Sequence, residues 1–125
     1  MTPKTLLLRQ INPSFLQAGR VTSQAFRPTP KDESYLSVYD GDRIHPLASW
    51  QHFTSTPGCR SAGVMAVTLE ECTAEKLSVN PDGAPFPEHV SIGFSAFGKS
   101  DIEKKAKVLT RQAQTRGWLF RAELE

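Results

Sequence analysis

The three histidines of the chain are the side chains best suited to acid–base chemistry near neutral pH. His89 follows Glu88 directly, after a proline-rich stretch and before the apolar residues that begin at Val90. A carboxylate and an imidazole at such a junction can act as general acid and base, so both residues are catalytic candidates, together with His45. The alternative is that Glu88 and His89 only begin a strand, where neighbouring side chains point to opposite faces.

A second group of polar side chains lies between residues 19 and 28. This segment holds two arginines, Arg20 and Arg27, among hydroxyl and amide side chains, and Arg9 precedes it. Guanidinium groups bind phosphate and carboxylate through paired hydrogen bonds. We therefore add Arg9 and Ser23 to the catalytic candidates, while an ordinary polar loop is the competing interpretation.

A third pattern is a basic stripe near the C-terminus. Lys104, Lys107 and Arg111 would share one side of a helix and could contact the phosphates of a nucleic acid. The formal net charge of +2, from 15 basic and 13 acidic residues, does not by itself indicate such binding. A solvated polar face is the usual explanation of a charged stripe on a helix.

Several classes of site are not expected. The histidines lack the spacing of three or four residues that helical metal ligands use, and Cys59 and Cys72 form no CxxC motif. The Asp40-Gly41-Asp42 sequence predicts a turn, because the later acidic ligand of a calcium loop is missing. We therefore expect no metal ion and no cofactor, and a disulfide between the two cysteines stays open.

Helices that could position these residues are indicated by capping residues and apolar periodicity. Ser100 and Glu103 predict a capping box, and Gly117 predicts the end of the helix that follows. Asn12 is a suitable N-cap for an earlier, shorter helix. The helices expected on these grounds cover about residues 12–19, 46–53 and 101–116.

Strands are predicted where β-branched and aromatic residues gather between turn residues. The expected strands cover about residues 5–11, 35–39, 63–68, 90–94 and 118–122, with irregular loops over 27–34 and 80–87. This order predicts one α+β domain over residues 1–125. We expect a mixed sheet of about five strands with two or three helices packed mainly on one face.

The composition bounds the surroundings of the protein. With 38% hydrophobic and 22% charged residues the chain is expected to be globular. The apolar run before Arg9 is too short for a signal peptide, and no stretch is long enough to span a membrane. We therefore expect a soluble cytoplasmic protein without a membrane partner.

Three functions follow as hypotheses. The first is an accessory or regulatory protein of the bacterial operon type that binds another protein through residues favoured at interfaces, namely Arg20, Phe26, Arg27, Tyr35, Trp50 and Phe86. The second is a small RNA- or nucleotide-directed transferase or nuclease that uses the catalytic candidates; it requires Arg9, Ser23 and His89 to line one cleft. The third is nucleic-acid binding through the basic stripe.

Overall fold

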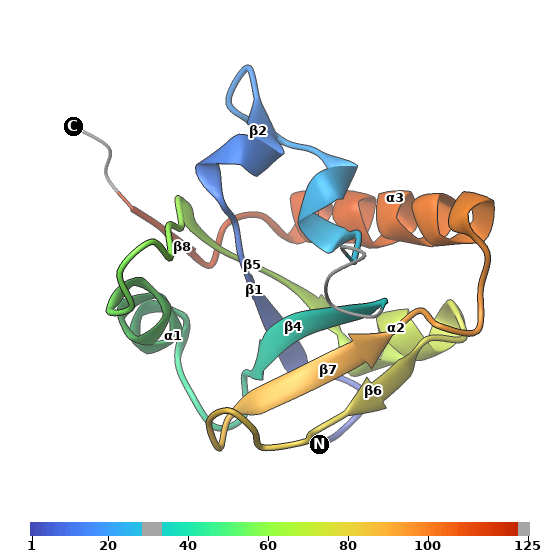
Figure 1. Cartoon of the computed structure of the whole chain (residues 1–125), viewed down its shortest axis with the longest axis horizontal. Coiled ribbons are helices and arrows are strands. Elements are labelled where there is room, and N and C mark those ends of the chain that lie inside the picture. Colours follow the sequence, from blue (N-terminus) through green and yellow to red (C-terminus); the bar gives the residue numbers. More distant parts are fainter. Residues whose placement is uncertain (29–33, 123–125) are drawn as a thin grey trace.

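A six-stranded sheet organises the computed structural model, which describes residues 1–28 and 34–122 (Figure 1). Its strands in spatial order are β6 (Ser78–Asn80), β7 (His89–Gly93), β4 (Tyr35–Asp40), β1 (Leu6–Gln10), β5 (Gly63–Thr68) and β8 (Phe120–Arg121). Every pair is antiparallel. The predicted α+β class is confirmed, but the sheet is not mixed, because no pair of its strands is parallel.

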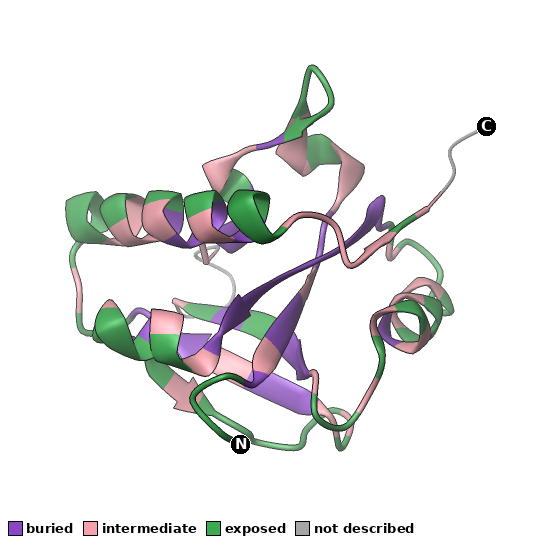
Figure 2. Cartoon of the chain, turned by 180° about the vertical axis from the view of Figure 1, so that it is seen from behind, coloured by how far each residue is buried: buried purple, intermediate pink, exposed green. Residues whose placement is uncertain are grey.

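Within the described residues, three α-helices cover the two faces of the sheet unequally. They are α1 (Pro46–Thr54), α2 (Leu69–Ala74) and α3 (Lys99–Arg116). The larger core lies on the face covered by α3, and Cys72 of α2 also packs into it. A smaller core lies on the opposite face, where Trp50 and Phe53 of α1 pack. Both faces of the sheet are therefore covered in its middle, and Figure 2 shows β5 as buried along its whole length.

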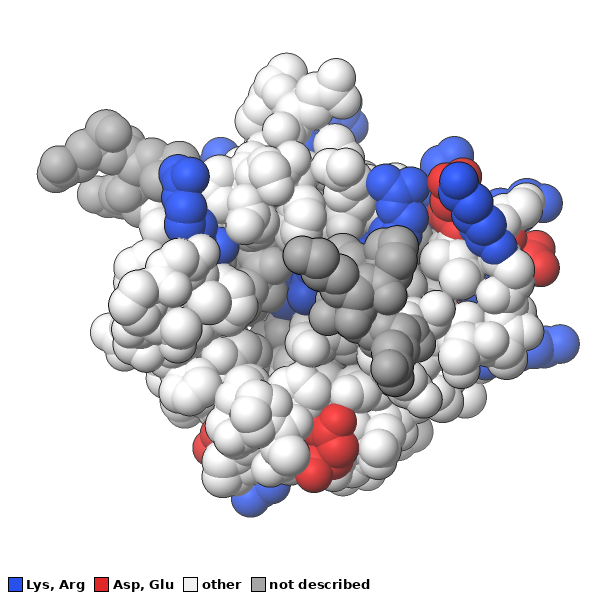
Figure 3. All heavy atoms as spheres, viewed as in Figure 1, with Lys and Arg blue, Asp and Glu red and all other residues white. Residues whose placement is uncertain are grey.

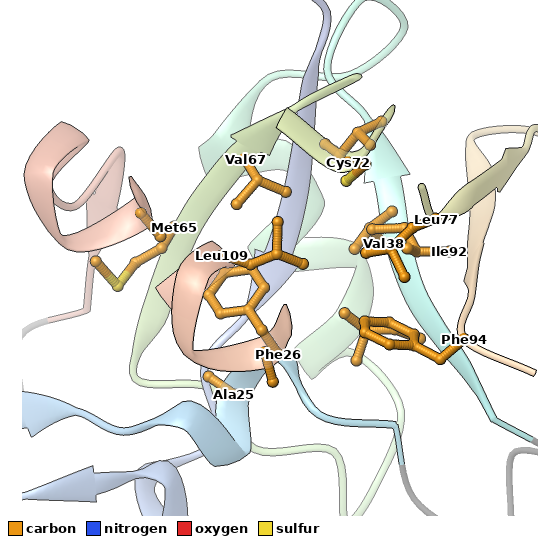
Figure 4. Close-up of a cluster of buried hydrophobic side chains, with 14 of the residues drawn as sticks. Ala25, Phe26, Val38, Met65, Val67, Cys72, Leu77, Ile92, Phe94 and Leu109 are labelled. Carbon is orange, nitrogen blue, oxygen red and sulfur yellow. The ribbon is translucent and has the colours of Figure 1, made fainter. Parts of the chain in front are cut away.

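Successive side chains of the central strands serve different cores, as the pleat of a strand requires. In β1, Leu7 packs into the larger core and Leu8 into the smaller one. The larger core joins Leu109 of α3 to Val67 of β5 and Phe94, which follows β7 (Figure 4). Alternation therefore decides which strand residues can contribute to a site on the α1 face.

The long helix α3 begins differently from its prediction. Its N-cap is Gly98, which makes no side-chain capping bond, so the predicted capping box of Ser100 and Glu103 is wrong. Glu103 instead forms an ion pair with Arg27, with 3.2 Å between Oε1 and Nη1. The end of the helix is as predicted: Gly117 has a φ of 89°, which costs glycine little because it has no Cβ.

The segment after β1 is not the predicted helix. Asn12 does cap one turn of 3-10 helix, η1 (Pro13–Phe15), and accepts a hydrogen bond from the Ser14 amide. A small hairpin of β2 (Leu16–Gln17) and β3 (Arg20–Val21) follows, and then the 3-10 helix η2 (Ser23–Phe26). Ala18 and Gly19 both have positive φ, a backbone geometry that turns a two-residue hairpin and cannot continue a helix.

Two predicted loops and one unpredicted helix complete the chain. Residues 81–88 connect β6 to β7 within the proline-rich stretch, whereas residues 29–33 of the other expected loop lie outside the described part. The helix α2 was missed, although Thr68 and Glu71 form a complete capping box at its start. Within the described ranges, no helix has the length and apolar character needed to cross a membrane.

Candidate functional site

Three side chains form a continuous hydrogen-bonded chain on the α1 face of the sheet. The Oδ1 atom of Asp82 lies 2.6 Å from Nδ1 of His89. The Nε2 atom on the other side of that imidazole lies 3.1 Å from Oγ of Ser37. Both distances fall within the range of hydrogen bonds, so an acid, a base and a hydroxyl are linked in series.

The positions of the protons in this series of three side chains follow from the groups at its two ends. An ionised carboxylate only accepts hydrogen bonds, so Nδ1 of a neutral His89 carries the proton and donates it to Asp82. Its Nε2 then accepts from the Ser37 hydroxyl. Partial burial opposes ionisation of Asp82, but hydrogen bonds from His89 and Ser91 outweigh it and hold the pKa of Asp82 below its ordinary value of 3.8. This pattern is the one in which a histidine can remove a proton from a serine.

Strand pairing and the turn after β6 bring Asp82 and His89 together. Asn80, the last residue of β6, pairs with Ser91 of β7. In the turn that follows, the Asp82 amide donates to the Asn80 carbonyl at 2.9 Å, and the Asp82 side chain reaches His89. In the next ladder Ser37 of β4 also pairs with Ser91. His89 is therefore the diagonal neighbour of Ser37 on the same face, within reach of a ring of its length.

The other side of Ser37 borders a gap in the sheet. The ladder between β1 and β4 holds only two pairs, the second between Leu8 and Tyr39. Beyond it, Nη1 of Arg9 donates to the Ser37 carbonyl at 3.0 Å, in place of a strand partner. If the register were extended by two residues, Gln10 would lie opposite Ser37. His89, Ser37 and Gln10 thus come from three neighbouring strands, β7, β4 and β1, and Asp82 comes from the loop that follows β6.

A cavity of about 210 Å³ opens beside Ser37, His89 and Gln10. Polar groups of Arg9, Gln10, Ser37 and His89 line it, together with apolar or aromatic residues from β4, α1 and the β6–β7 loop: Val38, Tyr39, Phe53, Pro85 and Phe86. The space-filling view shows the molecule hollowed near the middle of one face, with a basic side chain deep in the hollow (Figure 3). Ser37 and His89 therefore both border a space that a small molecule can enter.

Phe86 forms one wall of this cavity. Its ring stacks on Tyr39 with 4.7 Å between centroids and meets the ring of His89 edge-on at 5.2 Å. It also contacts His52 edge-on at 4.7 Å. The Tyr39 hydroxyl is itself held by Nδ1 of His52 at 2.7 Å. Burial, with the nearby charges of Cys59 and Glu88, raises the pKa of Tyr39 to about 12, so this hydroxyl stays protonated at neutral pH.

Gln10 is fixed on the opposite side of the cavity by two serines. Its Nε2 donates to Oγ of Ser49 at 3.0 Å, and its Oε1 accepts from Oγ of Ser61 at 2.9 Å. The amide orientation is therefore determined by its partners. A primary amide nitrogen carries two hydrogens, of which Ser49 takes one.

The catalytic candidates named from the sequence are only partly brought together. Arg9 and His89 line the same cavity, while Ser23, in η2, does not. Glu88 is not the carboxylate partner of His89; its backbone carbonyl accepts from the Asp40 amide. His45 is exposed at the N-cap of α1 and makes no capping bond through its side chain.

The residues named for binding fall into different environments. Phe26 is fully buried under α3, so its prediction as an interface residue is wrong; an aromatic ring of that size is most favourable in the core. Trp50 packs into the smaller core and donates to the Ser61 carbonyl. Tyr35 and Arg20 are exposed. The basic stripe of Lys104, Lys107 and Arg111 is exposed along α3.

Sequence reasoning missed Ser37 and Asp82. Asp82 stands in a Pro-Asp-Gly sequence, where its type is already explained by a turn. Ser37 interrupts a strand of apolar and aromatic residues, and that interruption is the one local signal it carries. Asp82 is 7 positions from His89 in the sequence and Ser37 is 52 positions from it, so no local motif joins them.

The cysteines and acidic residues do not form a second centre. Cys59 and Cys72 are both free thiols, and burial, followed by the charge of Glu71, raises the pKa of Cys72 to about 12. Among the residues that the structure describes, no three His, Cys, Asp or Glu side chains gather closely enough to hold a metal ion.

Comparison with known proteins adds no assignment to this geometry. No family model matches the chain, and neither the curated proteins nor the solved structures include a significant match.

Proposed function

We propose that the protein is a serine-dependent hydrolase that cleaves a small carboxylic ester through an acyl-enzyme. The observation that carries this proposal is the chain from Asp82 Oδ1 through His89 to Ser37 Oγ, with its distances of 2.6 and 3.1 Å. Groups of this kind are identified by geometry and roles, whatever their order in the chain.

In the first half of the reaction the Ser37 hydroxyl attacks the ester carbonyl carbon. His89 Nε2 takes the hydroxyl proton as the new C–O bond forms, and Asp82 stabilises the resulting imidazolium. The bond to the leaving alcohol then breaks, and the alcohol oxygen receives the proton back from His89. In the second half water repeats the attack on the acyl-enzyme, which releases a carboxylic acid and restores the Ser37 hydroxyl.

The developing negative charge on the carbonyl oxygen needs a donor beside Ser37. We assign this role to the second amide hydrogen of Gln10, since Gln10 lines the same cavity as Ser37 and Ser49 takes only the other hydrogen. Arg9 positions the nucleophile: its Nε and Nη1 atoms donate to the carbonyls of Ala25 and Ser37, at 2.7 and 3.0 Å. Arg9 thus holds β4 in place beyond the point where its pairing with β1 ends.

The character of the cavity favours a neutral ester over a nucleotide. Three aromatic rings, those of Tyr39, Phe53 and Phe86, line a space of about 210 Å³. Taking a polyanionic phosphate out of water into such surroundings is costly, whereas a short acyl group gains by burial. The proposal therefore keeps an enzymatic role but moves it away from RNA or nucleotides, and replaces Ser23 and Glu88 with Ser37 and Asp82.

A fluorophosphonate probe tests the proposal directly, because it phosphonylates activated serines and releases fluoride. Intact-mass analysis is expected to show one adduct on the wild-type protein and none on Ser37→Ala. The Ser95→Ala variant is the matched control, because Ser95 is exposed and lies outside the cavity. This variant should be labelled as the wild-type protein is. An unlabelled wild-type protein, or equal labelling of Ser37→Ala, would contradict the proposal.

Binding to another protein, the first of the three roles expected from the sequence, is a second proposal. Its support is the exposure of two large hydrophobic side chains, Tyr35 at 42% and Leu47 at 46%, with Arg20 also exposed. A pull-down from host cells should recover a stoichiometric protein with wild type and lose it with Tyr35→Ala. Recovery of no stoichiometric partner would count against this role.

The exposed stripe of α3 supports the nucleic-acid role only through its charge. Lys104, Lys107 and Arg111 recur on one side of the helix and are exposed. If they contact phosphates, affinity for a duplex should fall steeply with salt and fall again when all three are changed to Glu. Equal affinity of the triple variant would exclude the stripe as the binding surface.

A further inference from the structure

We infer that the cavity beside Ser37 is an acyl pocket that selects short, unbranched acyl chains, and that Phe86 sets its length limit. This inference rests on the proposed hydrolase function and adds the class of substrate to it. The carbonyl carbon would lie at Ser37, between His89 and Gln10, with the acyl chain directed toward the aromatic rings.

The size of the cavity sets the first limit. A volume of about 210 Å³ corresponds to about seven groups of the size of a water molecule, each occupying about 30 Å³ in the liquid. A drug-sized ligand needs about 300 Å³ or more. An acyl chain of about four to six carbons therefore fills the space, and a chain of eight or more exceeds it.

The lining sets the second limit. The polar side chains of Arg9, Gln10 and His89 accompany Ser37, whereas Phe53, Pro85 and Phe86 supply apolar surface. Since Ser37 must reach the carbonyl, the polar side chains suit the reacting group and the apolar side chains suit hydrocarbon. Each added methylene that is buried there should raise kcat/KM about fourfold, until the chain exceeds the space.

The wall formed by Phe86 is too well held to move aside easily. Its ring contacts Tyr39, His52 and His89 with centroid distances of 4.7, 4.7 and 5.2 Å. Backbone bonds hold its loop as well, with the His89 amide donating to the Phe86 carbonyl at 3.1 Å. Because close-packed rings resist displacement, the length limit should be sharp.

The experiment measures kcat/KM for p-nitrophenyl esters with acyl chains from two to twelve carbons. Wild type should peak at four to six carbons and fall at least tenfold by ten. Phe86→Ala should move the peak by several carbons to longer chains, and Phe86→Trp should move it to shorter ones. Phe97→Ala is the matched control, because Phe97 lies outside this cavity and packs against the larger core. Circular dichroism and fluorophosphonate labelling establish which variants are folded.

The outcomes separate the inference from the function on which it rests. Fluorophosphonate labelling of Ser37 with a flat chain-length profile, or with a peak that neither Phe86 variant moves, would overturn the acyl pocket and leave the nucleophile in place. Labelling without turnover of any ester would also overturn it. Absence of both labelling and turnover would overturn the hydrolase proposal itself.

Discussion

The Nε2 atom of His89 lies 3.1 Å from Oγ of Ser37, although 52 residues separate them in the chain. The contact exists because β4 and β7 are neighbours, with Ser37 paired to Ser91 and Tyr39 paired to His89. A diagonal across one antiparallel ladder thus joins a base to a hydroxyl at the edge of a cavity. We derive four predictions from this site and from the contacts that hold its scaffold.

Replacing the base should remove activity and leave the fold intact. His89→Gln is expected to lower kcat for a short ester by about 10²- to 10⁴-fold, the usual contribution of a general base. His45→Gln is the control, because His45 is exposed and lines no part of the cavity. Steady-state kinetics at neutral pH check this, and comparable losses in both variants would argue against a role for His89.

Asp82→Asn should act through His89 and therefore on kcat rather than KM. The amide can donate to Nδ1 and so favour the wrong tautomer, which is expected to lower kcat by up to about 10⁴-fold. Ser91→Ala removes one of the hydrogen bonds that Asp82 accepts, at 2.7 Å on Oδ2, and should cause a smaller loss. A rise in KM with unchanged kcat in Asp82→Asn would place Asp82 in binding and not in positioning the base.

Glu71→Gln should lower stability in a manner that depends on pH. Burial opposes ionisation of Glu71, but hydrogen bonds from Arg116 and Thr68 hold its pKa below the ordinary 4.5. The stabilisation of the fold by the ionised Glu71 side chain is therefore complete above pH 4.5. It is lost as the pH falls through the lowered pKa that Glu71 has in the folded protein. Glutamine can keep the capping box, so the difference at pH 7 reports the charge, about 1.5–3 kcal/mol.

Urea denaturation of both proteins from pH 7 to pH 3 measures this difference. It should shrink as the carboxylate of the wild type is protonated, until the two proteins have similar free energies of unfolding. Glu70→Gln is the control: Glu70 is exposed in the same helix turn and should cost less than about 1 kcal/mol. A difference that stays constant with pH would rule out the ion pair as its source.

Phe26→Ala should lower the free energy of unfolding rather than weaken binding to a partner protein. Phe26 is fully buried in the larger core, and removal of such a ring costs about 3–5 kcal/mol. Tyr35→Ala, at a position that is 42% exposed, should change stability by about 0.5 kcal/mol or less. Thermal unfolding followed by circular dichroism distinguishes the two variants, and a Phe26→Ala protein as stable as wild type would contradict this packing.

Local patterns predicted the elements whose causes are local. The apolar spacing and Gly117 predicted α3, and the continuous apolar run predicted β5 within its observed bounds. The same reasoning failed at the start of α3, where the side chains of Ser100 and Glu103 make no capping box. It failed again after Asn12, because the positive φ angles of Ala18 and Gly19 made a hairpin more favourable than a second helical turn.

By itself the sequence determined the α+β class and the placement of His89 at the start of a strand after a proline-rich loop. Only the tertiary structure decided that Asp82, His89 and Ser37 form one hydrogen-bonded series and that Gln10 lines the same cavity, since these residues come from three strands and a loop. Strand register is set by the burial of whole faces and by pairings between distant segments. Ser37 and Asp82 are ordinary residues of a strand and a turn, and they could gain their proposed chemistry only from neighbours that the fold supplies.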